Sequence, residues 1–494
     1  GMRFVEYYFG LPLAMIVLCI SFVPVFHRLK VYTAYEYLEQ RFDLKTRALT
    51  SFLFLLQRGL STGISIAAPS IILSSLLGWN IIWTNIIMGG VLIIYTVTGG
   101  ARAVAHTQQL QMIIIFAGML VAGYILVHRL PAGVGMSEVL HTGGRAGKLN
   151  IITTGFEGGK GFDWNDRYNL LSGIIGGFFL ALSYFGTDQS QVGRYLTARS
   201  VSESRLGLLL NGLVKVPMQF LILLLGVLVF VFYQYNRRPL FFNQSQLARL
   251  ERSRFRDSIR VLEANYAMQD KERLGLPNDD RGRLAKVGEL QAGERTTVKR
   301  WIDTIGGDSN DTNYVFLRFV TDYLPVGLIG LLIAVIMLAA WGSIAAALNA
   351  LASCTIVDFH RRFSRRVMLP EREYRLSRWY TLLWGIFCVF MAQVAYNAGN
   401  SLIEAVNVLG SLFYGVILGV FLVGFYCRKV GGHAVFISAA VVEAGVIALN
   451  ILAKKGIVPL SFLWFNAVGA VGVILLSNGL QAIMRRRGPV PAVK

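Results

Sequence analysis

Residues 207–230 read GLLLNGLVKVPMQFLILLLGVLVF, with Lys215 as their only charge. A helix of about 20 apolar residues spans roughly 30 Å, which is the thickness of the hydrocarbon core of a bilayer. Similar runs recur along nearly the whole chain of 494 residues, which is 54% hydrophobic and only 15% charged. Soluble domains carry roughly a quarter charged residues. The sequence therefore predicts an all-α, polytopic membrane protein.

Eleven apolar runs bounded by Gly, Pro or charged clusters predict eleven transmembrane helices. Their expected positions are 6–27, 48–77, 79–98, 107–129, 168–192, 205–235, 322–350, 379–398, 402–426, 432–453 and 459–483. Between them, residues 236–321 are rich in charge and broken by Gly and Pro. We expect this segment to form an extracellular insertion that is helical in part.

The distribution of Lys and Arg predicts the orientation, because positive charge in short loops resists translocation. One set of short loops carries 22 of these residues, and the opposite short segments carry only Arg3, Lys454 and Lys455. We therefore expect a plasma (inner) membrane protein with its N-terminus outside and its C-terminus in the cytoplasm. This basic collar beside an anionic leaflet explains the net charge of +20 without a nucleic-acid partner.

Motifs of several enzyme classes do not occur in the sequence. The glycine clusters lack the spacing of a Walker A loop, and the six His and four Cys are scattered without metal-ligand spacing. We therefore expect neither an ATP-driven pump nor an enzyme. The lipid bilayer is an expected partner, and the oligomeric state is not predicted.

Four strings of sequence resemble the sodium/solute symporter family, which includes sodium/glucose, iodide, multivitamin and sialic acid carriers. In family order, they are YTAYEYLEQRF at 32–42, YTVTGGARAV at 95–104, YFGTDQSQVGR at 184–194 and LNALASCTIVD at 348–358. The resemblance implies a single transporter domain with a LeuT-like, five-plus-five inverted-repeat fold. In that fold, substrate and sodium bind midway across the membrane, where the first helix of each repeat is broken.

On this resemblance, residues 168–426 form the second repeat and residues 432–483 form two further helices. Residues 1–130 supply only four helices of the first repeat, so we expect its broken first helix to be missing. Either the chain is N-terminally incomplete, which we favour, or it is a natural variant.

The predicted broken helix of the second repeat, 168–192, contains Gly173, Gly176, Gly177 and Gly186. These glycines supply the backbone freedom that a break needs, or they allow close helix packing.

The resemblance also implies a set of substrate-binding residues. Lys215 falls where a lysine touches the ligand in the family's sugar symporters, and a lysine at that depth is costly unless it faces a cavity or a partner. Tyr184 matches an aromatic residue that closes over the sugar, and is otherwise a packing residue. Glu6 and Asn407 match a ligand-binding glutamate and glutamine. Ala181 stands where those relatives bind hydroxyls with asparagine, which weakens the sugar interpretation.

Arg58 is a second cation inside a predicted helix, the one at 48–77. A cavity containing Arg58 and Lys215 suits an anionic substrate such as a carboxylate or an acidic sugar. Alternatively, Arg58 neutralises Asp188 or extends toward the membrane surface.

Sodium binding is implied at Ala339 and Ser343, where the family supplies a carbonyl and a hydroxyl. Gly342 stands at a second hydroxyl position, and Gln108 stands where the family has an acid that serves sodium. Because sodium needs several oxygen ligands, these two departures predict weakened coupling.

Together these patterns predict a secondary active transporter, with sodium-coupled symport of a small polar or anionic organic solute. The solute classes are a sugar, a sugar acid or a carboxylate, and Na+ is the coupling ion. The alternative is a transporter-like solute sensor with lost or weakened sodium coupling.

Overall fold

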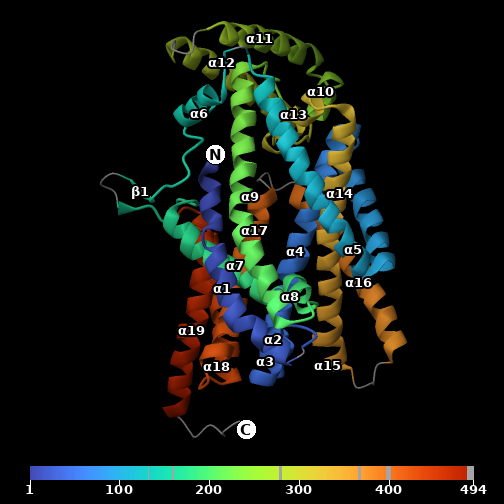
Figure 1. Ribbon diagram of the computed structural model, residues 1–494, viewed down its shortest axis with the longest axis vertical. Coiled ribbons are helices and arrows are strands. Elements are labelled where there is room, and N and C mark those ends of the chain that lie inside the picture. Colours follow the sequence, from blue (N-terminus) through green and yellow to red (C-terminus); the bar gives the residue numbers. More distant parts are fainter. Residues whose placement is uncertain are drawn as a thin grey trace.

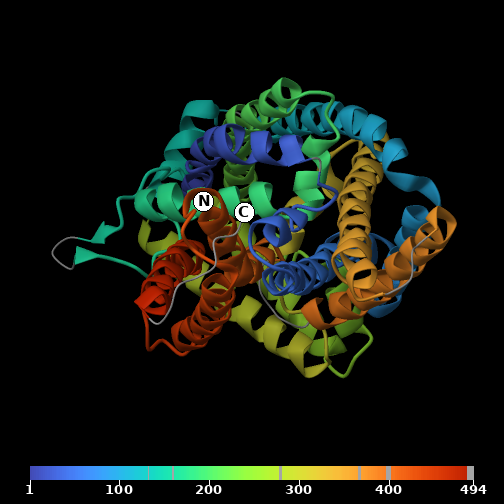
Figure 2. The ribbon, with the colours of Figure 1, turned by 90° about the horizontal axis from the view of Figure 1, so that it is seen from below.

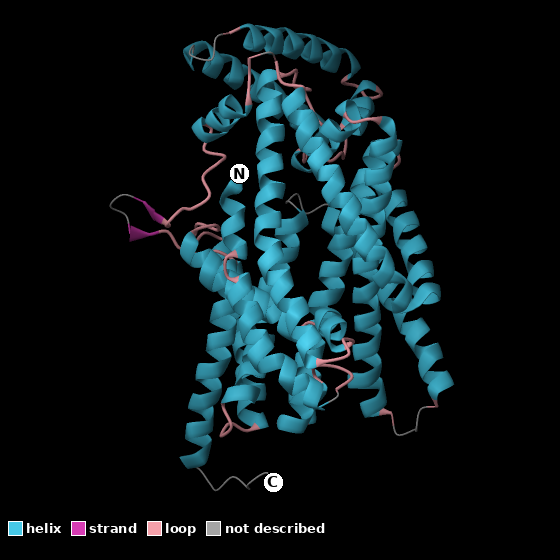
Figure 3. Ribbon diagram, viewed as in Figure 1, coloured by secondary structure: helices cyan, strands magenta, loops and turns pink. Residues whose placement is uncertain are grey.

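The computed structural model describes residues 1–29, 31–131, 133–157, 161–276, 281–364, 369–396 and 402–486. Figures 1 and 3 show an elongated bundle of long helices, covered at one end by shorter helices. In the described part, the strands are the two-residue β1 (Phe156–Glu157) and β2 (Gly161–Phe162), which pair antiparallel. The architecture is therefore almost entirely helical, as predicted.

Nine segments of the described chain form helices long and apolar enough to cross a membrane. They are Met2–Leu29, Leu44–Leu77, Ile81–Thr98, Leu110–His128, Val201–Tyr235, Val326–Phe363, Glu404–Tyr426, Gly432–Lys454 and Leu463–Met484. The other two predicted spans correspond to the shorter apolar helix Ser172–Thr187 and to a helix at Pro370–Tyr396. Each predicted apolar run therefore contains a helix in the part of the chain that the structure describes.

The long helices of the bundle are α4 (Leu44–Leu77), α5 (Ile81–His128), α9 (Val201–Tyr235), α14 (Val326–Cys354), α16 (Pro370–Tyr396), α17 (Leu402–Tyr426), α18 (Gly432–Lys454) and α19 (Leu463–Arg486). The shorter elements that connect them are α3 (Glu36–Arg41), α6 (Met136–Arg145), η4 (Thr312–Tyr314), α13 (Val315–Tyr323), η5 (Thr355–His360) and α15 (Arg361–Phe363).

The first predicted helix, 6–27, is a chain of four short elements. They are η1 (Met2–Tyr8), α1 (Leu11–Val17), the π-helical η2 (Leu18–Phe22) and α2 (Val23–Leu29). Pro12 stands in the first turn of α1, where its missing N–H costs no hydrogen bond.

The two helices predicted at 79–98 and 107–129 are one continuous element, α5. Its apolar segments, Ile81–Thr98 and Leu110–His128, are separate candidate spans. Gly99 and Gly100 lie between them and each weaken a helix by about 1 kcal/mol, which is not enough to end it.

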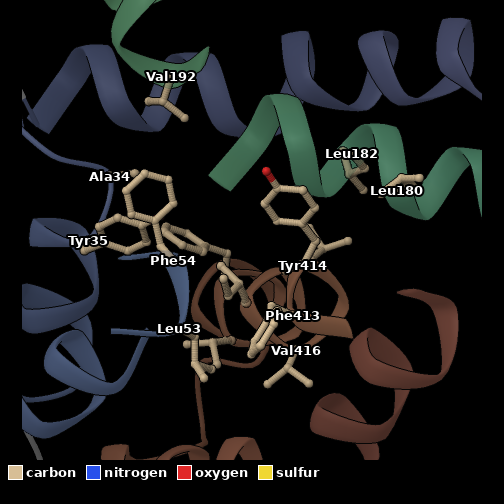
Figure 4. Packing of buried hydrophobic residues seen from close by; sticks show 14 of the residues in the cluster. Ala34, Tyr35, Leu53, Phe54, Leu180, Leu182, Val192, Phe413, Tyr414 and Val416 are labelled. Atoms are coloured by element: carbon tan, nitrogen blue, oxygen red, sulfur yellow. The ribbon is translucent and has the colours of Figure 1, made fainter. Parts of the chain in front are cut away.

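Helix α17 lies at the centre of the largest buried cluster. Val416, Ile417, Val420 and Phe421 on this helix are completely buried. Figure 4 shows Phe413, Tyr414 and Val416 of this helix close to Leu53 and Phe54 of α4. The backbones of α17 and α19 approach so closely that a side chain at Gly415 or Gly469 would collide with the opposite backbone.

The predicted broken helix, 168–192, is interrupted at Asp188, between α7 (Gly177–Thr187) and α8 (Gln189–Leu196). Asp188 is extended (ψ 116°), and its carboxylate accepts the Ser190 N–H at 2.8 Å, which caps α8. The glycines before the break allow close helix packing, which is the second of the two roles considered for them. A Cβ on Gly173 would lie 2.2 Å from the Glu6 carbonyl oxygen, so this glycine allows η3 (Ser172–Gly176) to pack against η1.

The predicted insertion forms a helical cap from α10 (Gln244–Glu251), α11 (Arg256–Gly275) and α12 (Arg281–Thr304). Leu250, Ile259 and Val298 form its small apolar core. The cap is joined to the preceding segment by Asp311, which accepts the Phe242 N–H at 2.7 Å and pairs with Arg295. Burial raises the pKa of the Asp311 carboxyl, although the Arg295 charge opposes the shift.

The two ends of the bundle differ in their elements. Figure 1 shows α3, α15 and the end of α19 at the end opposite α11 and α12. Figure 2, seen from below, shows the red C-terminal helices on the side of the bundle away from α5 and α16.

Candidate functional site

A cavity of about 300 Å³ lies between η1, α1, α4, α7, α9, α14 and α17. It is lined by Tyr7, Tyr8, Leu11, Gln57, Arg58, Ser61, Thr62, Ser65, Gly177, Leu180, Ala181, Tyr184, Phe185, Lys215, Ser343, Ile344, Ala347, Val406, Asn407, Gly410 and Tyr414. No acidic residue occurs among these described lining residues, whereas two cations do.

Five residues predicted from sequence converge on this cavity, although they come from five different helices and lie up to 349 positions apart in the chain. They are Arg58, Tyr184, Lys215, Ser343 and Asn407. The sequence separation between them is large, so their convergence is a property of the fold.

Helix α4 contributes the most polar wall of the cavity. Gln57, Arg58, Ser61, Thr62 and Ser65 are spaced by three or four residues, which places them on one side of the helix. The buried atoms Gln57 Oε1, Arg58 Nε and Thr62 Oγ1 have no hydrogen-bond partner among the described residues. Buried polar atoms are nearly always paired in folded proteins. This wall therefore presents free hydrogen-bonding groups to whatever fills the cavity.

Arg58 reaches both the cavity and the helix break. Its Nη1 lies 3.5 Å from Oδ2 of the fully buried Asp188, so the ion pair offered as an alternative role is present. The same carboxylate oxygen accepts the Tyr414 hydroxyl at 2.6 Å. Asp188 thus holds one end of the guanidinium, and Nε remains unpaired in the described structure.

Lys215 lies in the cavity wall, as its depth in α9 predicted. Its ammonium group is 5.7 Å from the ring centroids of Tyr8 and of Phe185. These contacts stabilise a cation by the quadrupole of the rings. No carboxylate of the described residues forms an ion pair with Lys215, so its charge is available to a ligand.

Aromatic residues line the remaining wall. The Tyr184 hydroxyl accepts a hydrogen bond from Gln191 Nε2 at 2.7 Å, and its ring meets Tyr414 edge-on. Tyr7 donates a long hydrogen bond (3.5 Å) to Asn407 Oδ1. The sequence interpretation did not include Tyr7 or Tyr8, although a run of aromatic residues surrounds Glu6 and signals this wall.

Glu6 does not line the cavity. Its carboxylate accepts the backbone N–H of Thr153 at 2.6 Å, and the side chain is completely buried. Arg3 forms an ion pair with Asp166 beside it. In this structure Glu6 therefore connects η1 to the segment that precedes α7.

The residues predicted to serve sodium lie in different surroundings. Ser343 lines the cavity, Gly342 is buried, and Ala339 is partly buried and is not part of the lining. The Gln108 side chain lies outside the part of the chain that the structure describes. Among described residues, no three His, Cys, Asp or Glu side chains cluster as a metal site. Sodium in proteins is bound instead by hydroxyl and carbonyl oxygens, which Ser343, Ser61 and Thr62 offer at this cavity.

Three of the four family-like strings meet at the end of the bundle that contains α3, where Gln189 bonds the backbone of Tyr32 and Ala34. Asp358 is completely buried and accepts hydrogen bonds from the Thr33 hydroxyl and Arg47 Nε, both at 2.8 Å. Arg47 also pairs with Glu39 at 2.6 Å. This network fixes α3 and the start of α4 to η5.

A sequence model described as the sodium:solute symporter family matches residues 1–243 and 292–441. The chain therefore belongs to this family of membrane transporters. The unmatched residues 244–291 include α10 and α11 of the cap.

Individual relatives agree with this assignment. A sodium/sialic acid symporter of Proteus mirabilis is 24% identical over 92% of this chain and 76% of its own length. A sodium-dependent multivitamin transporter of Oryctolagus cuniculus is 26% identical over 86% of this chain, which spans 55% of that relative. The solved substrate-bound, outward-open state of a Na+-coupled sialic acid symporter has a TM-score of 0.70 at 21% identity, covering 97% of this chain and 83% of that chain. The predicted transporter fold is confirmed.

Proposed function

We propose that this protein is a secondary transporter of a small organic anion, a carboxylate or an acidic sugar, with sodium as the coupling ion. The observation that carries the proposal is the charge of the cavity. Arg58 and Lys215 line it together, and no described acidic residue does. Asp188 compensates one of the two cations from behind, at 3.5 Å. A net positive charge remains, and a carboxylate neutralises it.

The size and walls of the cavity suit the same class of solute. A volume of about 300 Å³ accommodates a small molecule, at the lower end of the range for ligand pockets. The unpaired atoms of Gln57 and Thr62 are positioned to bind hydroxyl or carbonyl groups, and the rings of Tyr8 and Tyr184 cover apolar faces. Relatives named for sialic acid and for monocarboxylates transport solutes with this chemistry.

Sodium coupling fits the hydroxyl groups on the facing walls of the cavity. Ser343 on α14 and Ser61 and Thr62 on α4 all line the same cavity. An anion and a sodium ion bound in one cavity stabilise each other, so the loading of one favours the other. We infer that the chain transports its solute together with sodium. We also infer that it lies in the plasma membrane with the basic end of the bundle on the cytoplasmic side.

Uptake into proteoliposomes tests the proposal. We expect an inward sodium gradient to drive accumulation of labelled sialic acid or lactate, and the methyl ester of the same acid to compete at least tenfold more weakly, because it lacks the charge that Arg58 and Lys215 neutralise. Equal competition by acid and ester, or accumulation of galactose in place of both acids, would contradict an anionic substrate. Binding without accumulation would indicate the solute sensor instead.

A pair of variants separates charge from packing at Lys215. Lys215→Met removes the ammonium group and keeps an unbranched apolar stem, so we expect the KM for the acid to rise at least tenfold. Lys215→Arg keeps the charge and should restore most of the affinity. Unchanged KM values in a folded Lys215→Met protein would exclude this residue from the site.

A further inference from the structure

A second large hollow lies on the outside of the bundle, between α5 and α16. It measures about 470 Å³ and is separate from the central cavity in all of its lining residues. Figures 1 and 2 show these two helices at the edge of the bundle, away from the C-terminal helices. A side chain at Gly89 would collide with Val389, and one at Gly385 with Ile93, so the two helices are in close contact beside the hollow.

The walls of this groove are apolar and accessible. Ile94 and Trp379 are 65% and 63% exposed, and the other uncharged lining residues are Ile93, Val97, Thr98 and Leu382. In a transporter of this family such a surface faces lipid, since the α5 segment Ile81–Thr98 is a candidate span. The groove is therefore shaped for an apolar chain that lies along the helices.

One end of the groove carries positive charge. Arg375 and Arg378 both line it, and no carboxylate does so among the described residues. Arg361 and Arg362, which precede α16, are by contrast paired with Glu373 and Glu39. For Arg378 the contact found in the described structure is with the Tyr374 ring at 5.9 Å, which leaves its donors free.

The chemistry of a phospholipid matches both halves of the groove. A guanidinium binds a phosphate through paired N–H donors, and tryptophan prefers the boundary between headgroups and acyl chains. Arg375 and Arg378 belong to the basic set that predicts the cytoplasmic side, where anionic lipids gather. We propose that this groove is a binding site for an anionic phospholipid, with the phosphate on Arg375 and Arg378 and an acyl chain against Ile94 and Trp379.

The test compares two double variants of equal charge. In Arg375→Gln/Arg378→Gln the groove loses both cations. In Arg372→Gln/Arg428→Gln two exposed arginines outside the groove are removed. Each purified protein is mixed with phosphatidylglycerol or phosphatidylcholine, and the bound lipid is counted by native mass spectrometry.

We expect wild type and the Arg372/Arg428 variant to retain phosphatidylglycerol over phosphatidylcholine, and the groove variant to lose about tenfold in that preference. Arg375→Lys/Arg378→Lys should keep part of the preference and shows that loss is not caused by misfolding. Equal retention by the groove variant, equal loss in both Gln variants, or equal binding of phosphatidylcholine would overturn the proposal. So would full displacement by glycerol phosphate, because the headgroup alone would then account for binding.

Discussion

Arg47 and Arg58 lie on the same helix, about three turns apart, and their surroundings are opposite. Arg47 is 1% exposed and is held by Asp358, Glu39 and the Val357 carbonyl. Arg58 has one long ion pair, with Asp188, and a side-chain hydrogen bond with Tyr184, and its Nε has no partner among the described residues.

The difference separates two uses of a buried charge. A cation whose donors are all occupied fixes the position of helices, because any motion breaks several strong bonds. A cation that keeps free donors beside a cavity is incomplete until a ligand arrives. In the sequence Arg47 stands just before the predicted helix 48–77 and Arg58 stands inside it, but neither position shows whether the charge has a partner.

The largest effect should follow from removing Arg47. Arg47→Met leaves Asp358 buried without its counter-ion, and we expect a loss of about 3–5 kcal/mol in the free energy of unfolding. Thermal unfolding of the purified protein, followed by size-exclusion chromatography, measures it. Lys45→Met is the matched control, since Lys45 is exposed on the same helical turn and should change little. If the two variants have the same melting temperature, Arg47 does not stabilise the contact of α3 and α4 with η5.

Arg58→Gln should affect affinity more than stability. In this variant the Asp188 carboxylate still accepts hydrogen bonds from the Tyr414 hydroxyl and the Ser190 N–H, so it is not left without a partner. A lost charged hydrogen bond to the solute costs about 1.5–3 kcal/mol, which is a ten- to hundredfold rise in KM for an acid. Uptake kinetics and thermal unfolding are measured on the same preparation. A large fall in melting temperature with unchanged KM would place Arg58 with Arg47 as a structural cation.

The two arginines also show which features of the fold and of the site the sequence predicts. Each apolar run that hydropathy identified contains a helix in the described part of the structure, and the cost of an intramembrane cation identified Arg58 and Lys215, because each of these signals lies within a single segment. The sequence predicted a break within 168–192 but not its position at Asp188, since glycines that allow close packing give the same pattern as glycines that allow a break.

Glu6 shows the limit that long-range contacts set. Its hydrogen-bond partner is Thr153, which is 147 residues away, and no spacing along the chain predicts that contact. The free polar wall of α4 was within reach of the sequence. Gln57, Ser61 and Ser65 repeat every four residues in an apolar helix, which is the pattern of a polar stripe.

Glu443 provides a third kind of buried charge, one without a visible partner. It is 6% exposed in the middle of α18, and neither carboxylate oxygen has a hydrogen-bond partner among the described residues. It does not line the central cavity. Glu443→Leu should therefore raise stability by about 1–3 kcal/mol, because it removes an unpaired polar group from the interior. A lower melting temperature than wild type would show that this carboxyl has a partner that stabilises it.

The smallest expected effect concerns sodium at α14. A sodium ion that enters the protein must replace its lost water with oxygen ligands, and Gly342 offers no side-chain oxygen where the family resemblance places a hydroxyl. We expect uptake by the wild type to depend only shallowly on sodium, and Gly342→Ser to lower the sodium concentration for half-maximal uptake about threefold, the share of one hydrogen bond. Gly330→Ser is the matched control, since it makes the same change on the same helix at a position with open space. Steep sodium dependence in the wild type that Gly342→Ser leaves unchanged would mean that Ser343 and the hydroxyls of α4 already complete the ion's shell. In that case the polar face of α4 that lines the cavity binds the sodium ion as well as the solute. That face has the unpaired groups that distinguish Arg58 from Arg47.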